Sequence, residues 1–217
     1  MSKISEKPFT CPYCGYEGEF KMYDSVNVTL DPKLRDKVIS GKIFEWICPK
    51  CLQKISIRHD LLYHDMDKNF MIYYSPKNCP EINDMINDTQ AKCPGMRKLS
   101  RTVDSLNALR EKIYIFEESL NDIAIELAKL VIKYDKNIHL PKTCELRFES
   151  VIPHGKKQSC SNHIFRQIID GIPQKEFVLF DKINYDRCLN EVTTNEAYKM
   201  TQYCDTIDEK WIIDRSV

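Results

Sequence analysis

The spacing of apolar residues in the first 76 positions predicts β-strands. Alternating apolar and polar side chains are typical of a half-buried strand, and residues 19–28 follow this pattern with one polar break at Asp24. Asp31-Pro32 predicts a short helix, with Asp31 as its N-cap and Gly41 as its end. We therefore expect antiparallel β-structure with one inserted helix. The further strands are expected at residues 7–10, 42–47, 54–58 and 70–74.

The apolar period lengthens from two to about 3.5 residues after position 105, as in a helix with a heptad seam. One continuous helix of about 30 residues would be near 45 Å long and could join two copies of the chain. A break at 119–122, with Ser119 and Asp122 as a capping box, would instead give two helices. We favour the break, because further apolar residues widen the face beyond a dimer seam. The seam consists of Leu106, Leu109, Ile113, Phe116, Leu120, Ile123, Leu127, Leu130 and Tyr134.

The remaining segments are less regular. Residues 77–95, which contain Cys79 and Cys93, are predicted to be an insertion-like loop or short helix with buried thiols. Strands are expected at 144–151 and 177–180, and a helix at 183–192.

These patterns together predict an α+β fold. Residues 1–135 are expected to form a β-rich domain on which the helical segment 103–134 packs. Residues 136–217 are expected to form a mixed α/β part, either separate or within the same globule.

The composition excludes several classes of protein. The chain has 32 Lys and Arg residues against 32 Asp and Glu, so its formal charge is zero and nucleic acid or anionic lipid would need a local basic patch. Only 6 of 217 residues are Gly, which disfavours a glycine-lined nucleotide site. We expect no membrane association, because no run of about 18 apolar residues occurs. Residues 1–10 lack an apolar signal segment, so we expect the reducing cytoplasm.

Four of the ten cysteines form two Cys-Pro-x-Cys pairs, Cys11/Cys14 and Cys48/Cys51, separated by 33 residues. Such pairs at strand ends can bind one tetrahedral metal ion, as in a zinc ribbon. The gap is longer than the spacing of about 15–20 residues common for such sites. Gly15 follows the first pair and favours a turn with positive φ, whereas Leu52 takes the matching place after the second.

A structural zinc site is the interpretation that we favour for these cysteines. A redox dithiol would need a strand-to-helix junction in a βαβ unit, and strands are expected after both pairs. Four thiolates fill the coordination shell and leave no position for substrate, so the ion would be structural. Iron also accepts four thiolates, and the sequence does not decide between the two metals.

The chain resembles the CpXC domain of bacterial and archaeal proteins. The resemblance rests on both cysteine motifs, on Asp31-Pro-x-Leu-Arg35, on Leu62-Tyr-His-Asp-Met66 and on Leu109-Arg-Glu-Lys-Ile113, and covers roughly residues 8–132. It implies a metal-binding module whose signature cysteines are Cys11, Cys14, Cys48 and Cys51. It implies no activity.

Two further groups of residues are weaker candidates. The pairs His59-Asp60 and His64-Asp65 could act in acid–base chemistry, although His59 and His64 would point to opposite faces of an extended chain. Cys160 and His163 have a ligand-like spacing, with Cys144 and His154 as the nearby partners for a second metal. Exposed polar side chains without a chemical role are the simpler explanation for both groups, so no catalytic or cofactor-binding residue is assigned.

The function expected is an intracellular zinc-binding adaptor for another protein. The first alternative is a zinc ribbon that binds nucleic acid through Tyr13, Tyr16 and Trp46 beside nearby lysines. The second is an enzyme that uses residues 59–65. An oligomer could form through residues 106–134.

Overall fold

The computed structural model describes residues 2–77, 81–93, 98–153, 161–200 and 202–216. The chain forms two compact units. Unit 1 comprises Met1–Arg110 and Tyr203–Asp205, and unit 2 comprises Glu111–Gln202 and Thr206–Val217. The division falls inside a helix, and the domain boundary expected at residue 135 stays a prediction.

Unit 1 contains a mixed sheet of six strands in the order β1-β2-β5-β6-β7-β11. The pairs β1–β2 and β5–β6 are antiparallel, as expected. The pairs β2–β5, β6–β7 and β7–β11 are parallel, so the sheet is mixed, which the sequence pattern did not predict. The strands are β1 (Lys3–Thr10), β2 (Glu17–Asn27), β5 (Leu61–Asp65), β6 (Phe70–Tyr74), β7 (Leu99–Val103) and β11 (Cys204–Asp205).

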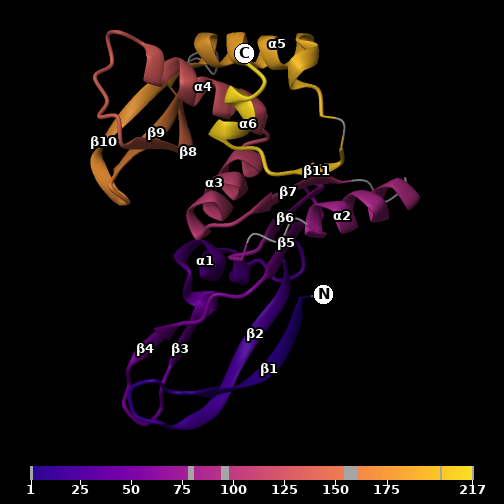
Figure 1. The fold of residues 1–217 in the computed structure, drawn as a ribbon, viewed down its shortest axis with the longest axis vertical. Coiled ribbons are helices and arrows are strands. Elements are labelled where there is room, and N and C mark those ends of the chain that lie inside the picture. Colours follow the sequence, from indigo (N-terminus) through magenta and orange to yellow (C-terminus); the bar gives the residue numbers. More distant parts are fainter. Residues whose placement is uncertain (1, 78–80, 94–97, 154–160, 201, 217) are drawn as a thin grey trace. The chain divides into compact units, whose positions relative to one another are not determined.

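A two-stranded ribbon, β3 (Glu45–Ile47) and β4 (Lys54–Ser56), accompanies this sheet. Figure 1 shows the β3–β4 ribbon beside the long β1–β2 hairpin, with both turns at the same end of unit 1. The strand expected at 42–47 begins as a 3-10 turn, η1 (Lys42–Phe44), and becomes extended only at Glu45. This turn brings Ile43 and Phe44 into the core of the unit.

Helix α1 (Lys33–Ser40) ends as predicted at Gly41, whose φ of 77° is the left-handed conformation that favours glycine. Its start differs from the prediction. Pro32 is the N-cap and no side chain caps the helix, because the Asp31 carboxylate accepts a hydrogen bond from Ser2 instead.

The segment 77–95 contains helix α2 (Glu81–Lys92), which connects the parallel strands β6 and β7. Parallel neighbours need such a crossover. The helix packs on the sheet through Met85 and Ile86, which lie with Leu62 and Met71 around a small apolar cavity. Cys93 is exposed, so the prediction of a buried thiol is wrong for this residue, and Cys79 lies outside the described residues.

The predicted break in the helical region is confirmed. Helix α3 (Leu106–Glu117) ends before Ser119, whose φ is 57°, and α4 (Asp122–Tyr134) follows. The cap differs from the predicted capping box, because Asn121 accepts hydrogen bonds from the amides of Ile123 and Ala124. Most seam residues, Leu109, Ile113 and Phe116 among them, are buried within the chain, and an oligomer through residues 106–134 stays a prediction.

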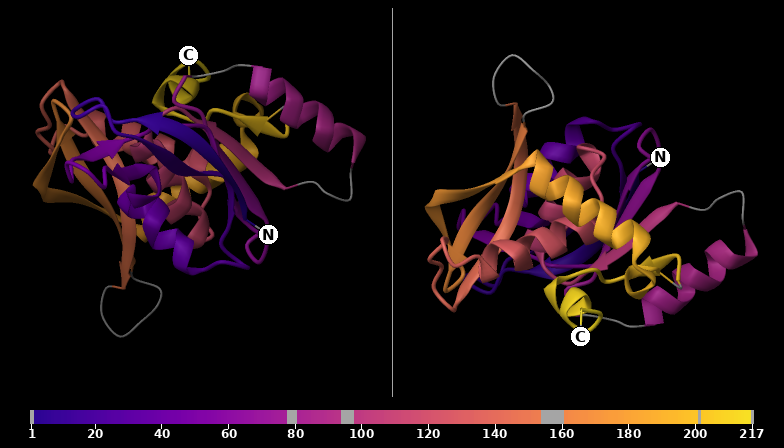
Figure 2. Two further views of the ribbon diagram at one scale, coloured as in Figure 1. Left: turned by 90° about the horizontal axis from the view of Figure 1, so that it is seen from below. Right: turned by 90° about the horizontal axis from the view of Figure 1, so that it is seen from above.

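Unit 2 has an antiparallel sheet in the order β10-β9-β8. Helices α4 and α5 (Lys182–Thr194) pack on each other and on this sheet, and the right-hand view of Figure 2 shows α5 alongside the strands. The strands are β8 (Cys144–Pro153), β9 (Ser161–Ile169) and β10 (Ile172–Asp181), and the remaining elements are η3 (Glu196–Tyr198) and α6 (Glu209–Ile213). The expected α+β fold class is therefore correct. No helix within the described residues is long and apolar enough to cross a lipid bilayer.

Candidate metal centre

The first cysteine pair lies in the turn that connects β1 to β2. The amide of Cys11 donates to the carbonyl of Tyr16 at 2.8 Å, and the amide of Gly15 donates to the carbonyl of Cys11 at 2.9 Å. Gly15 has a φ of 69°, which a residue with a side chain adopts only at a cost. The turn is thus closed by two backbone hydrogen bonds around the two thiols.

The second pair repeats this geometry between β3 and β4. The amide of Cys48 donates to the carbonyl of Gln53 at 3.0 Å, and the amide of Leu52 donates to the carbonyl of Cys48 at 2.9 Å. Leu52 has a φ of 60° and takes the place of the glycine, with 75% of its surface exposed. Two equivalent knuckles therefore form although only one contains glycine.

The four sulfur atoms of Cys11, Cys14, Cys48 and Cys51 all lie within 4.8 Å of one another. The Cys11–Cys51 and Cys14–Cys48 sulfur distances are both 3.6 Å. Four ligands at about 2.3 Å around a tetrahedral ion would be about 3.8 Å apart, whereas a disulfide requires about 2.05 Å. The cluster therefore fits a single metal ion, as the spacing of the pairs predicts, and its four cysteines are free thiols.

The thiols have very different proton affinities. Burial acts to raise the pKa of Cys48, but the amides of Cys51 and Lys50 and the neighbouring thiols outweigh it and lower the pKa to about 7. For Cys51, the amide of Gln53 acts to lower the pKa, but burial and the three neighbouring sulfurs raise it to about 12. One thiolate therefore forms readily, and full ionisation of the cluster needs a cation among the sulfurs.

A small apolar cluster supports the centre. Cys11 and Cys48 are buried together with Phe20 and Trp46. Trp46 contacts Phe9 edge to face, with ring centroids 5.1 Å apart, and its Nε1 donates to the carbonyl of Glu19. The burial of Trp46 removes it from the stacking surface considered for nucleic acid, and that alternative stays a prediction.

His59 is placed by aromatic contacts. Its ring lies 5.8 Å from Phe20 and 4.9 Å from Phe44, and its Nδ1 bonds to the carbonyl oxygen of Asp60 at 2.9 Å. It therefore contacts a backbone oxygen rather than an orienting carboxylate.

His64 and Asp65 contact different residues. Nε2 of His64 lies 2.8 Å from Nζ of Lys98, and burial followed by the Lys98 charge lowers the pKa of the imidazole. Asp65 is buried and accepts hydrogen bonds from Thr29 and from the amide of Lys68, as expected of a turn residue. The structure therefore gives residues 59–65 contacts that stabilise the fold, and an enzyme that uses them stays a prediction.

His163 belongs to the core of unit 2. It is 2% exposed and stacks on Tyr185 with ring centroids 4.3 Å apart. It pairs with Val151, seven positions along β8 from Cys144, a separation of roughly 23 Å in a strand. Cys144 and His163 are therefore not co-ligands, and His154 and Cys160 lie outside the described residues.

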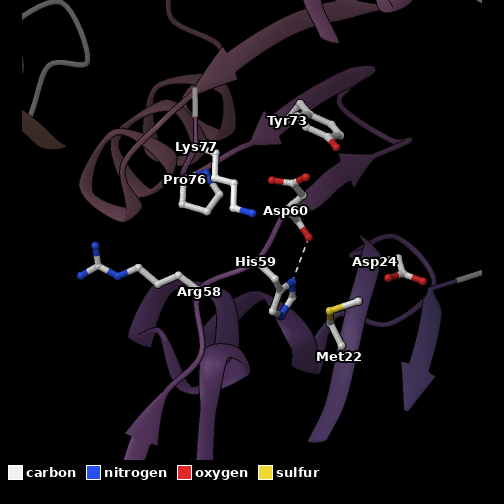
Figure 3. A pocket seen from close by; sticks show the side chains of 8 residues that line it. All are labelled: Met22, Asp24, Arg58, His59, Asp60, Tyr73, Pro76 and Lys77. Atoms are coloured by element: carbon white, nitrogen blue, oxygen red, sulfur yellow. Dashed lines mark hydrogen bonds between the residues drawn. The ribbon is translucent and has the colours of Figure 1, made fainter. Parts of the chain in front are cut away.

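Unit 1 holds a second group of polar residues, of which sequence reasoning singled out only His59 and Asp60. A cavity lies between β2, the start of β5 and the end of β6, and Figure 3 shows the eight side chains that line it. Two signals pointed there: the polar break at Asp24 in an otherwise alternating strand, and the charged run Arg58-His59-Asp60. The residues come together only because β2 and β5 pair in parallel, which the pattern did not predict.

A comparison with protein-family models agrees with the cysteine geometry, whereas two other comparisons found no match. No curated protein and no solved structure matches the chain. The family model described as CpXC protein matches residues 9–129, more than half of the chain and inclusive of both knuckles. The chain therefore belongs to the CpXC protein family.

Proposed function

We propose that this protein is a cytoplasmic zinc-binding protein and that the ion has a structural role. The observation that carries the proposal is the convergence of four cysteine sulfurs within 4.8 Å at the ends of two ribbons. Zinc has no geometric preference that conflicts with this arrangement, and four thiolates leave no coordination position for a substrate. The ion would join the β1–β2 turn to the β3–β4 turn.

Metal analysis of the protein purified from cells supplied with both zinc and iron tests this proposal. We expect one zinc per chain, and loss of the ion in Cys48→Ser, since Cys48 is one of the four ligands. Cys93→Ser is the matched control, because Cys93 is an exposed thiol outside the cluster. Bound iron in place of zinc, or equal metal content in Cys48→Ser and the wild type, would contradict the proposal.

We further propose that the rigid knuckles present a surface to a partner protein. Apolar side chains are exposed in or beside both turns, with exposed fractions of 67% for Tyr13, 59% for Ile47 and 75% for Leu52. Exposed apolar groups that a rigid scaffold holds in place are favourable contacts for a protein surface.

Co-purification with the zinc-loaded chain tests the partner. The double variant Tyr13→Ser/Leu52→Ser is compared with the wild type and with Leu30→Ser, whose side chain is 57% exposed outside the knuckles. We expect a protein that is retained by the wild type and by Leu30→Ser but lost from the double variant at unchanged zinc content. Retention that does not depend on the knuckle residues would contradict this surface.

A further inference from the structure

Unit 1 contains a cavity of about 390 Å³, in the size range of small-molecule sites. It borders the apolar cluster around Cys11 and Cys48, because Met22 in its wall also packs against that cluster. Its wall combines an apolar part, formed by Met22, Pro76 and the ring of Tyr73, with charged groups. Figure 3 shows these side chains around a common space, with the guanidinium of Arg58 directed away from the others.

The charged groups of this cavity are only partly satisfied. Asp24 accepts a hydrogen bond from Ser5 at 3.2 Å, and Nζ of Lys3 lies 3.9 Å away. Asp60 accepts one hydrogen bond from Ser75 at 3.0 Å. Lys77 forms no ion pair with the part of the chain that the structure describes, and its ammonium extends toward the side where Asp60 and His59 lie. Asp24 thus already has the Lys3 ammonium beside it, whereas Asp60 and Lys77 have no ion-pair partner among the described residues, and all three keep hydrogen-bonding capacity for a ligand.

The ring of His59 forms part of the same wall. Because its Nδ1 faces a carbonyl oxygen, the proton of the neutral ring lies on Nδ1, which leaves Nε2 as an acceptor. Nε2 is buried and has no hydrogen-bond partner among the described residues. Because Nε2 has almost no accessible surface, it does not face the cavity, and the polar contacts offered to a ligand are those of Asp24, Asp60 and Lys77.

We propose that this cavity binds a small zwitterion, a molecule of amino-acid type with one ammonium and one carboxylate group. The ligand ammonium would lie near Asp24 and Asp60, and its carboxylate would lie near Lys77. With the Lys3 ammonium beside Asp24, the charges of Asp24, Asp60, Lys3 and Lys77 sum to zero. A zwitterion keeps this site neutral, whereas a simple anion or a simple amine would add an uncompensated charge. Met22 and Tyr73 would contact the aliphatic part of the ligand.

Calorimetric titration of the full zinc-loaded chain tests the charge requirement. The probes are glycine, L-leucine, 4-aminobutyrate and 6-aminohexanoate, which separate the two charges by increasing distances. Butylamine and butyrate carry one charge each and serve as controls. We expect at least one zwitterion to bind with a Kd below about 1 mM, and both controls to bind at least about tenfold more weakly. No heat from any of the zwitterions, or butylamine or butyrate binding as tightly as the best of them, would overturn the proposal.

Substitutions at the two ends of the cavity locate the site. Lys77→Met and Asp24→Asn should each weaken the best zwitterion about tenfold. Lys37→Met, which changes an exposed lysine of α1, should leave the Kd unchanged. Equal zinc content and melting temperature would show that each variant is folded. Unchanged affinity in both cavity variants would place binding elsewhere and overturn the proposal.

Discussion

At the scale of single residues, Leu52 holds a conformation that its side chain disfavours. A left-handed conformation costs an L-residue roughly 1–2 kcal/mol, whereas glycine adopts it readily but loses more entropy on folding. Leu52 has a φ of 60° and is mostly exposed, so little packing is lost when its side chain is removed. We expect Leu52→Gly to stabilise the zinc-loaded chain by about 0.5–1 kcal/mol in urea unfolding, with unchanged zinc content.

Gly15 provides the matched reverse experiment. It has a φ of 69°, and a Cβ added there would meet no atom within 4 Å. Gly15→Ala therefore adds backbone strain without a steric clash, and it should destabilise the chain by a similar amount. A change of the same sign in both variants would show that factors other than this backbone conformation control the stability of the knuckles.

The residues of the metal centre could be predicted because two cysteines in a short turn are held together by local geometry. The caps were harder to predict, since they depend on which side chain competes for each amide. Asp31 is engaged by Ser2, 29 positions away, and Asn121 takes the capping role expected of Ser119. The zwitterion cavity could not be predicted, because Asp24, Asp60 and Lys77 meet only through the strand pairing.

At the scale of elements, α3 and α4 are joined by a buried charge network. Nζ of Lys129 lies 2.7 Å from Glu111 and 3.0 Å from Glu126, and Nζ of Lys112 lies 2.9 Å from Asp122. Burial raises the pKa of Glu111, with Lys129 opposing it. Burial would lower the pKa of Lys129, but the carboxylates of Glu111 and Glu126 outweigh it and raise the pKa. These buried carboxylates and ammonium groups are therefore stable in the core only while each is paired with an opposite charge.

Lys129→Met should destabilise the chain by about 3–5 kcal/mol, because it leaves buried carboxylates without their partner. Lys133→Met is the control one turn further on. Lys133 pairs with Glu209 at a more exposed position, and its loss should cost at most about 1 kcal/mol. Equal losses in the two variants, measured by urea unfolding at pH 7, would contradict a buried network.

The loss of unfolding free energy in Lys129→Met should also depend on pH. A carboxyl whose folded pKa is raised binds its proton more tightly in the folded chain, so its stabilising effect is present at low pH and is lost as pH rises through that pKa. Burial raises the pKa of Glu111 from its ordinary value of 4.5, and removal of Lys129 removes an opposing charge. The difference in unfolding free energy between the wild type and Lys129→Met should therefore shrink as pH falls from 7 toward 4.5. Urea unfolding across this range measures the difference, and a value that stays constant would contradict the prediction.

Helix α2 attaches β11 to the first sheet through Asn87. Its side chain accepts from the amide of Cys204 at 2.7 Å and donates to the carbonyl of the same residue at 3.0 Å. We expect Asn87→Ala to destabilise the chain by about 1–3 kcal/mol and to speed hydrogen exchange at the Cys204 amide. Asp88→Ala, on the exposed face of α2, should change neither the free energy of unfolding nor the exchange rate of the Cys204 amide. Unchanged exchange at Cys204 in Asn87→Ala would contradict this attachment.

Element types were predictable where one face of a segment is buried and the period is regular. The broad apolar face of 106–134 predicted helices, and the break followed from its polar residues. The sequence pattern did not predict β9, in which polar residues interrupt the alternation, or the place of β11 in the first sheet. Strand β11 is only two residues long, and its pairing with β7 depends on a tertiary contact about 100 positions away.

At the scale of the whole molecule, the metal is expected to stabilise one region rather than the entire chain. The β3–β4 ribbon has two short strands, and isolated two-stranded ribbons are marginally stable in water. Its contact with the β1–β2 hairpin depends on the four sulfurs and on the small cluster around Phe20 and Trp46. The sheet β8–β9–β10 has three long strands, a core of Phe148, Phe165 and Phe180, and two packed helices.

Hydrogen exchange before and after metal removal tests this division. Because the ligands belong only to the two knuckles, a chelator should remove most of the protection of the amides in residues 9–20 and 45–57. The amides of β8, β9 and β10 should keep their protection, since none of their strand pairings includes a ligand cysteine. Cys48→Ser should reproduce the chelated pattern without chelator, and Cys93→Ser should match the untreated wild type. A loss of protection spread evenly over both units would mean that the ion controls global unfolding, and no loss at all would mean that apolar packing alone holds the knuckles together.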